Sequence, residues 1–339
     1  MNDKMTARNT GISLLRYLFS FVAVVVHVEP DLSNDVQYFF YDMGPYIVPV
    51  FLFVSFYLIG GMMNGPKPQA LRTRFLRILY PLVFWTLVYY VVLSLVRQSW
   101  IDYRQLFYSL LLGSARQLNP PMWFLAMQLY ITGLVFVLCF LFPDSGKRDM
   151  LFLGLIAFCL AMQYSGANLY LLGDCAYESY YFFGKFFEVL PFALSALLFK
   201  KYESLLAGGK RLLLMAGLLL GAALGALLPE APGLGCQGVP LLFITLLLCV
   251  TMISLPHVKS RRAAYWINEL SQYTLGIYCM HVLMGQLLDG IVHHSALTLW
   301  KGTLIYDLIV WLLCLGASVL AGRMAKRIPR LKRLSFAVM

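Results

Sequence analysis

The sequence has few charged residues. Only 13% of its 339 residues are Asp, Glu, Lys or Arg, while 60% are hydrophobic and the mean hydropathy is +0.73. A soluble domain normally has about a quarter of its residues charged, so this chain has too few charges to cover a water-exposed surface. Alternating apolar segments of about ten residues, which a membrane β-barrel would need, are also lacking. The composition therefore predicts an all-α integral membrane protein.

The seven cysteines lack the spacing of a metal site. No CxxC or CxxxC pair occurs, so no metal is expected. Five cysteines lie within apolar runs, whereas Cys175 and Cys236 lie in connecting segments, and a disulfide between these two is an open alternative. Linkers rich in Ser or Pro are lacking as well. The chain is therefore expected to form one transmembrane domain over residues 1–339, without an appended soluble domain or a cleaved signal peptide.

Ten apolar runs of about 17–22 residues, roughly the length that crosses a bilayer as a helix, predict ten transmembrane spans. Lys and Arg concentrate in cytoplasmic loops. With the N-terminus inside, 21 of the 27 Lys and Arg residues fall in inner segments, four fall in outer segments, and Arg16 and Lys185 fall within spans. Both termini are therefore predicted to be cytoplasmic. The basic residues behind the net charge of +11 then anchor the chain at the cytoplasmic face of the lipid bilayer. Binding to nucleic acid is not needed to explain this charge. The predicted spans cover residues 11–29, 45–63, 78–96, 122–142, 150–164, 181–199, 211–228, 239–255, 272–290 and 302–321.

Arg16 and His27 are two ionisable residues on the first predicted span. Eleven residues rotate a helix by three turns and about 20°, so both side chains share one face, about 16 Å apart along the axis. Charged groups inside a membrane are costly and therefore point to function. A neutral imidazole accepts a proton or carries an acyl group, and a guanidinium holds a phosphate. The alternative is that Arg16 extends to the inner interface while His27 forms a hydrogen bond within the bundle.

Five segments in chain order resemble the motifs of the acyltransferase 3 family of membrane acyltransferases. The second one departs from the family pattern, because Phe56 stands where the family normally has Gly, although Ser55 is retained. The segments are Leu15–His27 (LRYLFSFVAVVVH), Val50–Gly60 (VFLFVSFYLIG), Arg74–Trp85 (RFLRILYPLVFW), Trp123–Tyr130 (WFLAMQLY) and Leu270–Val282 (LSQYTLGIYCMHV).

The resemblance implies a multi-pass enzyme of the bacterial inner membrane. Such an enzyme moves an acyl group, usually acetyl, from cytoplasmic acyl-CoA to a hydroxyl of a cell-surface glycan or a lipid-linked sugar. It implies that Arg16 and His27 are required. Acetyl-CoA is therefore the expected donor, and a homo-oligomer stays open.

Further residues are candidates for binding the donor or the acceptor. The basic residues Arg72, Arg74 and Arg77 would hold the CoA phosphates in a cytoplasmic loop, or would only anchor the chain. Candidates for the acyl group or acceptor are Glu29, Ser55, Trp123, Tyr130, Lys185, Glu188, Tyr278 and His281.

Several of these residues have a second, structural interpretation. His281 would pair with His27 or be a buried structural histidine. Lys185 and Glu188 have i,i+3 spacing, which favours mutual neutralisation on one helix face. Glu29 would raise the basicity of His27, although an ideal helix points it about 200° away.

Two other classes of function stay open. Intramembrane ionisable groups, including Asp307 in the last span, would suit the proton relay of a secondary transporter of a small metabolite or amino acid. A scaffold for cell-envelope synthesis would not explain why Arg16, His27 and His281 are placed in the membrane. The amphipathic segment 102–117 predicts an interfacial helix under either reading.

Overall fold

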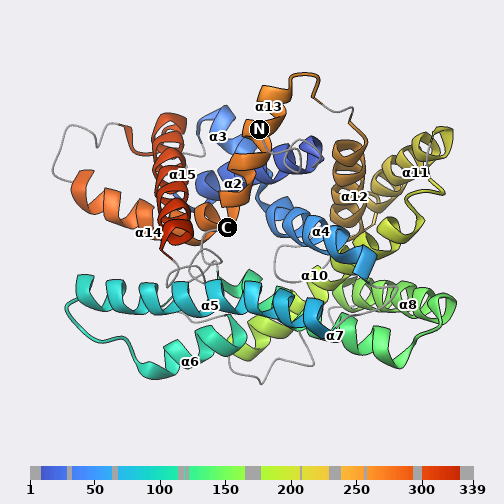
Figure 1. The fold of residues 1–339 in the computed structure, drawn as a ribbon, viewed down its shortest axis with the longest axis horizontal. Coiled ribbons are helices and arrows are strands. Elements are labelled where there is room, and N and C mark those ends of the chain that lie inside the picture. Colours follow the sequence, from blue (N-terminus) through green and yellow to red (C-terminus); the bar gives the residue numbers. More distant parts are fainter. Residues whose placement is uncertain are drawn as a thin grey trace. The chain divides into compact units, whose positions relative to one another are not determined.

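Helices are the only regular structure in the described part of the chain (Figure 1). The computed structural model describes residues 9–28, 33–62, 68–113, 118, 122–164, 177–206, 208–228, 238–255, 258–292 and 300–328. The predicted all-α class is confirmed for these residues. Their helices are α2 (Thr10–His27), α3 (Asp35–Asp42), α4 (Ile47–Ile59), α5 (Pro68–Val96), α6 (Tyr103–Leu112), α7 (Trp123–Leu141), α8 (Ser145–Tyr164), α10 (Tyr177–Tyr202), α11 (Gly209–Gly225), α12 (Gly238–Ser254), α13 (Arg261–Leu270), α14 (Thr274–Val292) and α15 (Leu304–Arg327), with 3-10 turns η1 (Gly44–Tyr46), η2 (Gly60–Met62) and η4 (Ser271–Tyr273).

Each of the ten predicted spans coincides largely with helical residues. Six helical segments are long and apolar enough to cross a membrane, and α12 is a shorter apolar helix. The number of ten spans and the cytoplasmic placement of both termini stay predictions. The six segments are Thr10–His27, Asp35–Ile59, Gln69–Val96, Trp123–Leu141, Phe182–Tyr202 and Leu304–Arg327.

Helices α5 and α8 begin five or more residues earlier than the apolar runs predicted. Helix α5 begins at Pro68 rather than at residue 78, and α8 begins at Ser145 rather than at residue 150. Hydropathy detects only the apolar part of a helix, whereas proline and polar residues are well tolerated in a first turn. At α8, the Asp144 carboxylate accepts the Gly146 amide at 2.8 Å, as an N-cap residue does.

The amphipathic segment predicted over 102–117 forms helix α6, while its interfacial location stays a prediction. The Asp102 side chain caps this helix by accepting the Arg104 amide at 3.0 Å. Gly113 ends it with φ of +66°, a conformation that favours glycine. A Cβ at Gly113 would also lie 2.5 Å from Cα of Trp123. This glycine therefore lets α6 end against the first turn of α7.

The chain forms two compact units, each assembled from segments that are distant in sequence. The first unit contains residues 1–47, 80–98 and 253–339, and the second contains residues 48–79 and 99–252. Helix α5 contributes its first turns to the second unit and its remainder to the first. The single transmembrane domain over 1–339 stays a prediction.

In the first unit, α2 packs against α14, α15 and α13, and α14 lies beside α15 (Figure 1). Polar contacts fix these packings: Ser13 Oγ donates to Asn268 Oδ1 at 2.6 Å, and Trp311 Nε1 donates to Ser20 Oγ at 3.1 Å. Asp307 is buried and accepts from Gln37 Nε2 at 2.8 Å. These partners satisfy polar groups that would be costly to bury alone.

In the second unit, α10 packs along α8 and also contacts α7 and α6 (Figure 1). Gln163 of α8 donates to the Phe187 carbonyl of α10 at 3.0 Å. The Tyr164 hydroxyl accepts the Val239 amide at the start of α12 at 2.9 Å. The Cys175–Cys236 disulfide, left open by the sequence, lies outside the described residues, and the five cysteines of the apolar runs are buried and form no disulfide with one another.

Candidate active site

Helix α2 carries both residues of the predicted Arg and His pair. The Asn9 side chain caps the helix by accepting the Ile12 amide at 3.2 Å, and the helix then continues without a break to His27. The eleven-residue spacing therefore acts as predicted and places both side chains on one helix face. Arg16 is half-buried, whereas His27, the last residue of α2, has an exposed side chain.

The His27 ring is fixed by a carbonyl of its own helix. Its Nδ1 lies 2.8 Å from the Ala23 carbonyl oxygen, which can only accept a hydrogen bond. In the neutral imidazole the proton is therefore on Nδ1, and Nε2 keeps its lone pair. The backbone carbonyl one turn earlier thus supplies a hydrogen-bond partner for His27.

His281 of α14 lies beside His27. The two ring centroids are 4.9 Å apart, and the rings meet nearly edge to face at 73°. The predicted pairing of His281 with His27 is thus found as a ring contact. His281 is 0% exposed, and its Nδ1 lies 2.7 Å from the Tyr278 carbonyl oxygen. Its Nε2 has no hydrogen-bond partner among the residues that the structure describes.

The two imidazoles present the same chemistry to each other. Each Nδ1 donates to a carbonyl of its own helix, so each neutral ring offers an Nε2 lone pair. Two lone pairs cannot form a hydrogen bond together. A group that carries a proton, such as a hydroxyl, would satisfy an Nε2 acceptor, and a buried acceptor without a donor is costly. The pair is therefore suited to receive a hydroxyl or a proton.

Tyr89 positions the helix that carries His281, and sequence reasoning missed it. Its hydroxyl donates to the Cys279 carbonyl at 3.0 Å and accepts the Leu283 amide at 3.1 Å. In a regular α-helix, the Leu283 amide would donate to the Cys279 carbonyl, four residues earlier. Tyr89 is 1% exposed and thus bridges the backbone on either side of His281. A tyrosine in an apolar run gives no signal of this contact in the sequence.

A second polar cluster lies in the second unit and contains Ser55, Arg74 and Gln128. The Ser55 Oγ atom accepts short hydrogen bonds from Arg74 Nη2 and from Gln128 Nε2. The Arg74 guanidinium also lies 5.7 Å from the centroid of the Phe56 ring. Phe56 is fully buried, so the residue that departs from the family pattern packs against the predicted phosphate ligand.

The other basic residues predicted for CoA have less defined surroundings. Arg72 and Arg77 are exposed, and both lie on helix α5. The prediction that these arginines form a loop is therefore wrong, because the helix extends beyond the apolar run.

The remaining acceptor candidates meet around α10. Lys185 Nζ lies 2.7 Å from Glu188 Oε2, as the i,i+3 spacing predicted, and 5.4 Å from the centroid of the Trp123 ring. The Tyr130 hydroxyl donates to the Leu111 carbonyl at 2.7 Å, and its ring packs edge-on against Phe182.

The structure thus brings together only some of the predicted site residues. Arg16, His27, Tyr278 and His281 belong to the first unit, and Glu29 lies outside the described residues. The second unit holds Ser55, Arg72, Arg74, Arg77, Trp123, Tyr130, Lys185 and Glu188.

The apolar helices indicate a multi-pass membrane protein, and one of its helix bundles brings the His27 and His281 imidazoles into contact. A family model described as an acyltransferase domain, that of acyltransferase 3, matches residues 9–324, and the chain belongs to this family. The resemblance predicted from the five motifs is confirmed. No curated protein and no solved structure matches the chain. The family implies transfer of an acyl group to a glycan or a similar acceptor.

Proposed function

We propose that the protein transfers an acyl group, acetyl in the simplest case, from acyl-CoA to a hydroxyl of a cell-surface glycan or lipid-linked sugar. The observation that carries the proposal is the His27–His281 contact, in which both Nε2 atoms offer lone pairs. An acceptor hydroxyl supplies the proton that these lone pairs lack. Membership of the acyltransferase 3 family supports the reaction class.

In the proposed reaction His27 acts as the general base. Its Nε2 removes the proton of the acceptor hydroxyl while the oxygen attacks the thioester carbonyl. The C–S bond then breaks, and CoA leaves as a thiol after taking that proton from His27. His281 Nε2 accepts a hydrogen bond from a second hydroxyl of the acceptor and so orients the sugar. In the alternative sequence, His27 Nε2 attacks the thioester and forms an acyl-imidazole, which the hydroxyl then cleaves.

The donor would reach His27 from the cytoplasmic side. Arg16, about 16 Å along the same helix face, is placed to hold a phosphate of CoA while the pantetheine arm extends along α2. Arg74, with Arg72 and Arg77, is the second candidate for the CoA phosphates. Its hydrogen bond to Ser55 and its packing on Phe56 hold the guanidinium in one orientation.

The acceptor is proposed as a class only. The segment 271–327 resembles the O-acetyltransferase of enterobacterial common antigen, which favours a bacterial envelope glycan and the inner membrane as location. Lys185, Glu188 and Trp123 form a partly exposed polar and aromatic group that would suit a sugar.

The purified full chain tests the proposal through CoA release from acetyl-CoA in the presence of an envelope glycan. His27→Ala should reduce kcat by about 10²–10⁴-fold, as expected for loss of a general base. His257→Ala, a histidine of a predicted cytoplasmic loop, is the matched control and should leave the rate unchanged. Wild-type turnover by His27→Ala would remove His27 from the reaction. Solute uptake into proteoliposomes without CoA release would instead favour the transporter.

Labelled acetyl-CoA distinguishes the two chemical sequences. Without acceptor, an acyl-imidazole sequence leaves one label on His27, detectable by peptide mass spectrometry. Direct transfer leaves the protein unlabelled under the same conditions.

A further inference from the structure

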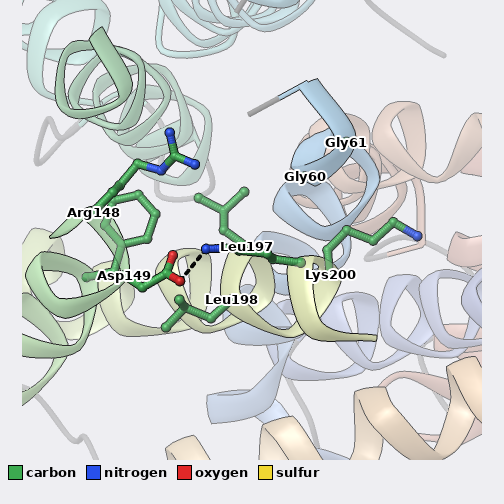
Figure 2. A pocket seen from close by; sticks show the side chains of 9 residues that line it. Gly60, Gly61, Arg148, Asp149, Leu197, Leu198 and Lys200 are labelled. Carbon is green, nitrogen blue, oxygen red and sulfur yellow. Dashed lines mark hydrogen bonds and ion pairs between the residues drawn. The ribbon is translucent and has the colours of Figure 1, made fainter. Parts of the chain in front are cut away.

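A cavity with four charged residues in its lining lies in the second unit. It has a volume of about 110 Å³ and is enclosed by the turn η2, the first turns of α8 and the last turns of α10 (Figure 2). A single water needs only roughly 10–15 Å³ by the same measure, so a polyatomic group fits here. Its polar lining residues are Arg148, Asp149, Lys200 and Lys201.

Two of the three cations at the cavity already have carboxylate partners. Lys200 Nζ lies 2.8 Å from Glu203 Oε2, and Lys201 forms an ion pair with Asp149, drawn as the dashed line in Figure 2. The Asp149 carboxylate also accepts from the Tyr202 hydroxyl. The charge of each lysine is thus balanced by an acid of the same cluster.

Arg148 is different, because it is buried without an acid. Its side chain is 5% exposed, and Figure 2 shows it extending away from the Asp149–Lys201 pair. In the part of the chain that the structure describes, no carboxylate forms an ion pair with it. Its side chain forms a hydrogen bond with the neutral Cys139 thiol. An arginine that only anchors the chain would extend into water or headgroups. The neighbouring Lys147 is exposed in this way, whereas Arg148 is buried.

We propose that this cavity binds a phosphate group, with the Arg148 guanidinium as its main ligand and with Lys201 adding positive charge at the cavity wall. A guanidinium pairs with phosphate through two parallel N–H···O bonds. Lys200 also lines the cavity, but its ammonium group points away from Arg148 (Figure 2). The cluster of Arg148, Lys200, Lys201, Asp149 and Glu203 has one positive charge in excess, which an anion neutralises. Close approach of η2 helps to form the site, because a Cβ at Gly60 would meet Lys200 Cγ at 2.6 Å.

Two sources of this phosphate share the same chemistry. Both Arg148 and the two lysines lie in segments that the charge distribution predicts to be cytoplasmic, where anionic lipid headgroups and CoA are both present. The CoA source rests on the proposed function, whereas the lipid source does not.

The experiment compares Arg148→Gln with Lys147→Gln in the full-length chain purified in detergent. Each variant removes one positive charge, but only Arg148 lines the cavity. Inorganic phosphate at constant ionic strength should raise the melting temperature of the wild type and of Lys147→Gln. Arg148→Gln should bind phosphate at least tenfold more weakly, which corresponds to about 1.4 kcal/mol. Arg148→Lys keeps the charge but loses the two parallel N–H···O bonds, so it should bind phosphate more weakly than the wild type and more tightly than Arg148→Gln. It replaces the Gln variant if that one does not fold, and wild-type phosphate binding by Arg148→Lys would then count against the proposal.

Two further probes identify the source. If CoA supplies the phosphate, the wild type should prefer CoA to dephospho-CoA, and Arg148→Gln should lose that preference. If lipid supplies it, native mass spectrometry should show phosphatidylglycerol, but not diacylglycerol, retained by the wild type and lost from Arg148→Gln.

The proposal is overturned if phosphate does not stabilise the wild type, or if Lys147→Gln weakens binding as much as Arg148→Gln. Unchanged binding of all three phosphate probes by Arg148→Gln would also overturn it. Loss of acyl transfer in His27→Ala with normal phosphate binding contradicts neither the proposed function nor the phosphate site. Acyl transfer and phosphate binding are measured separately, so failure of the proposed function and failure of this site remain distinguishable.

Discussion

Replacing His281 by Asn and by Gln separates its two ring nitrogens. The Nδ1 atom donates to the Tyr278 carbonyl at 2.7 Å, while Nε2 has no partner among the described residues. An Asn amide nitrogen lies near the position of Nδ1, so His281→Asn keeps the donor to Tyr278 and loses the second acceptor. A Gln amide reaches the position of Nε2, so His281→Gln keeps an acceptor there and loses the bond to Tyr278.

The Asn variant is expected to lose more of the rate, and the Gln variant more of the stability. If His281 Nε2 orients the acceptor by accepting from one of its hydroxyls, Asn should lower kcat by about 10–100-fold, or about 1.4–2.7 kcal/mol. Gln should keep a larger share of the rate. The Gln variant should instead lose about 0.5–1.5 kcal/mol of stability with the Tyr278 bond.

The assay measures kcat and KM for acyl transfer beside the melting temperature of each variant. An Asn variant with wild-type kcat, together with an inactive Gln variant, would refute the reasoning. That result would assign His281 a purely structural role through Tyr278. A fall in kcat with unchanged melting temperature for Asn is the outcome that a structural role does not produce.

Three further substitutions have defined outcomes. Tyr89→Phe removes the hydroxyl that bridges the α14 backbone, so the melting temperature should fall with a loss of about 1–3 kcal/mol, and kcat should fall as well. Ser55→Ala leaves the donors of Arg74 and Gln128 without their shared acceptor. Titration should then show acyl-CoA binding about tenfold weaker. The control Ser318→Ala loses only a hydrogen bond within its own helix and should bind acyl-CoA as the wild type does. Arg16→Ala should raise KM for acyl-CoA about tenfold or more with a smaller change in kcat; an unchanged KM would exclude it from donor binding.

Much of the fold was predictable because membrane insertion depends on composition. Runs of apolar residues of sufficient length must form helices in a bilayer, since only a helix satisfies its own backbone there. The runs therefore located the helices well but their ends poorly. Polar first turns, such as those of α5 and α8, belong to the helix by hydrogen bonding and not by hydropathy.

The candidate site was predictable where it depends on one helix. The spacing of Arg16 and His27 follows from helical geometry alone, and so does the Lys185–Glu188 ion pair. The motifs also identified His281 and Ser55, but their spacing could not say what each one contacts.

By itself, the sequence determined that this is a helical membrane protein of the acyltransferase 3 family with an arginine and a histidine on one face of its first helix. Only the tertiary structure decided that His281 meets His27, that Tyr89 bridges the backbone around it, and that Arg148 is buried at a cavity where no carboxylate of the described residues forms an ion pair with it. The reason is physical: helix formation and periodicity depend on neighbours within about one turn. Contacts between residues distant in sequence, such as His27 with His281 and Tyr89 with Cys279, depend instead on how whole helices pack, which no local pattern encodes.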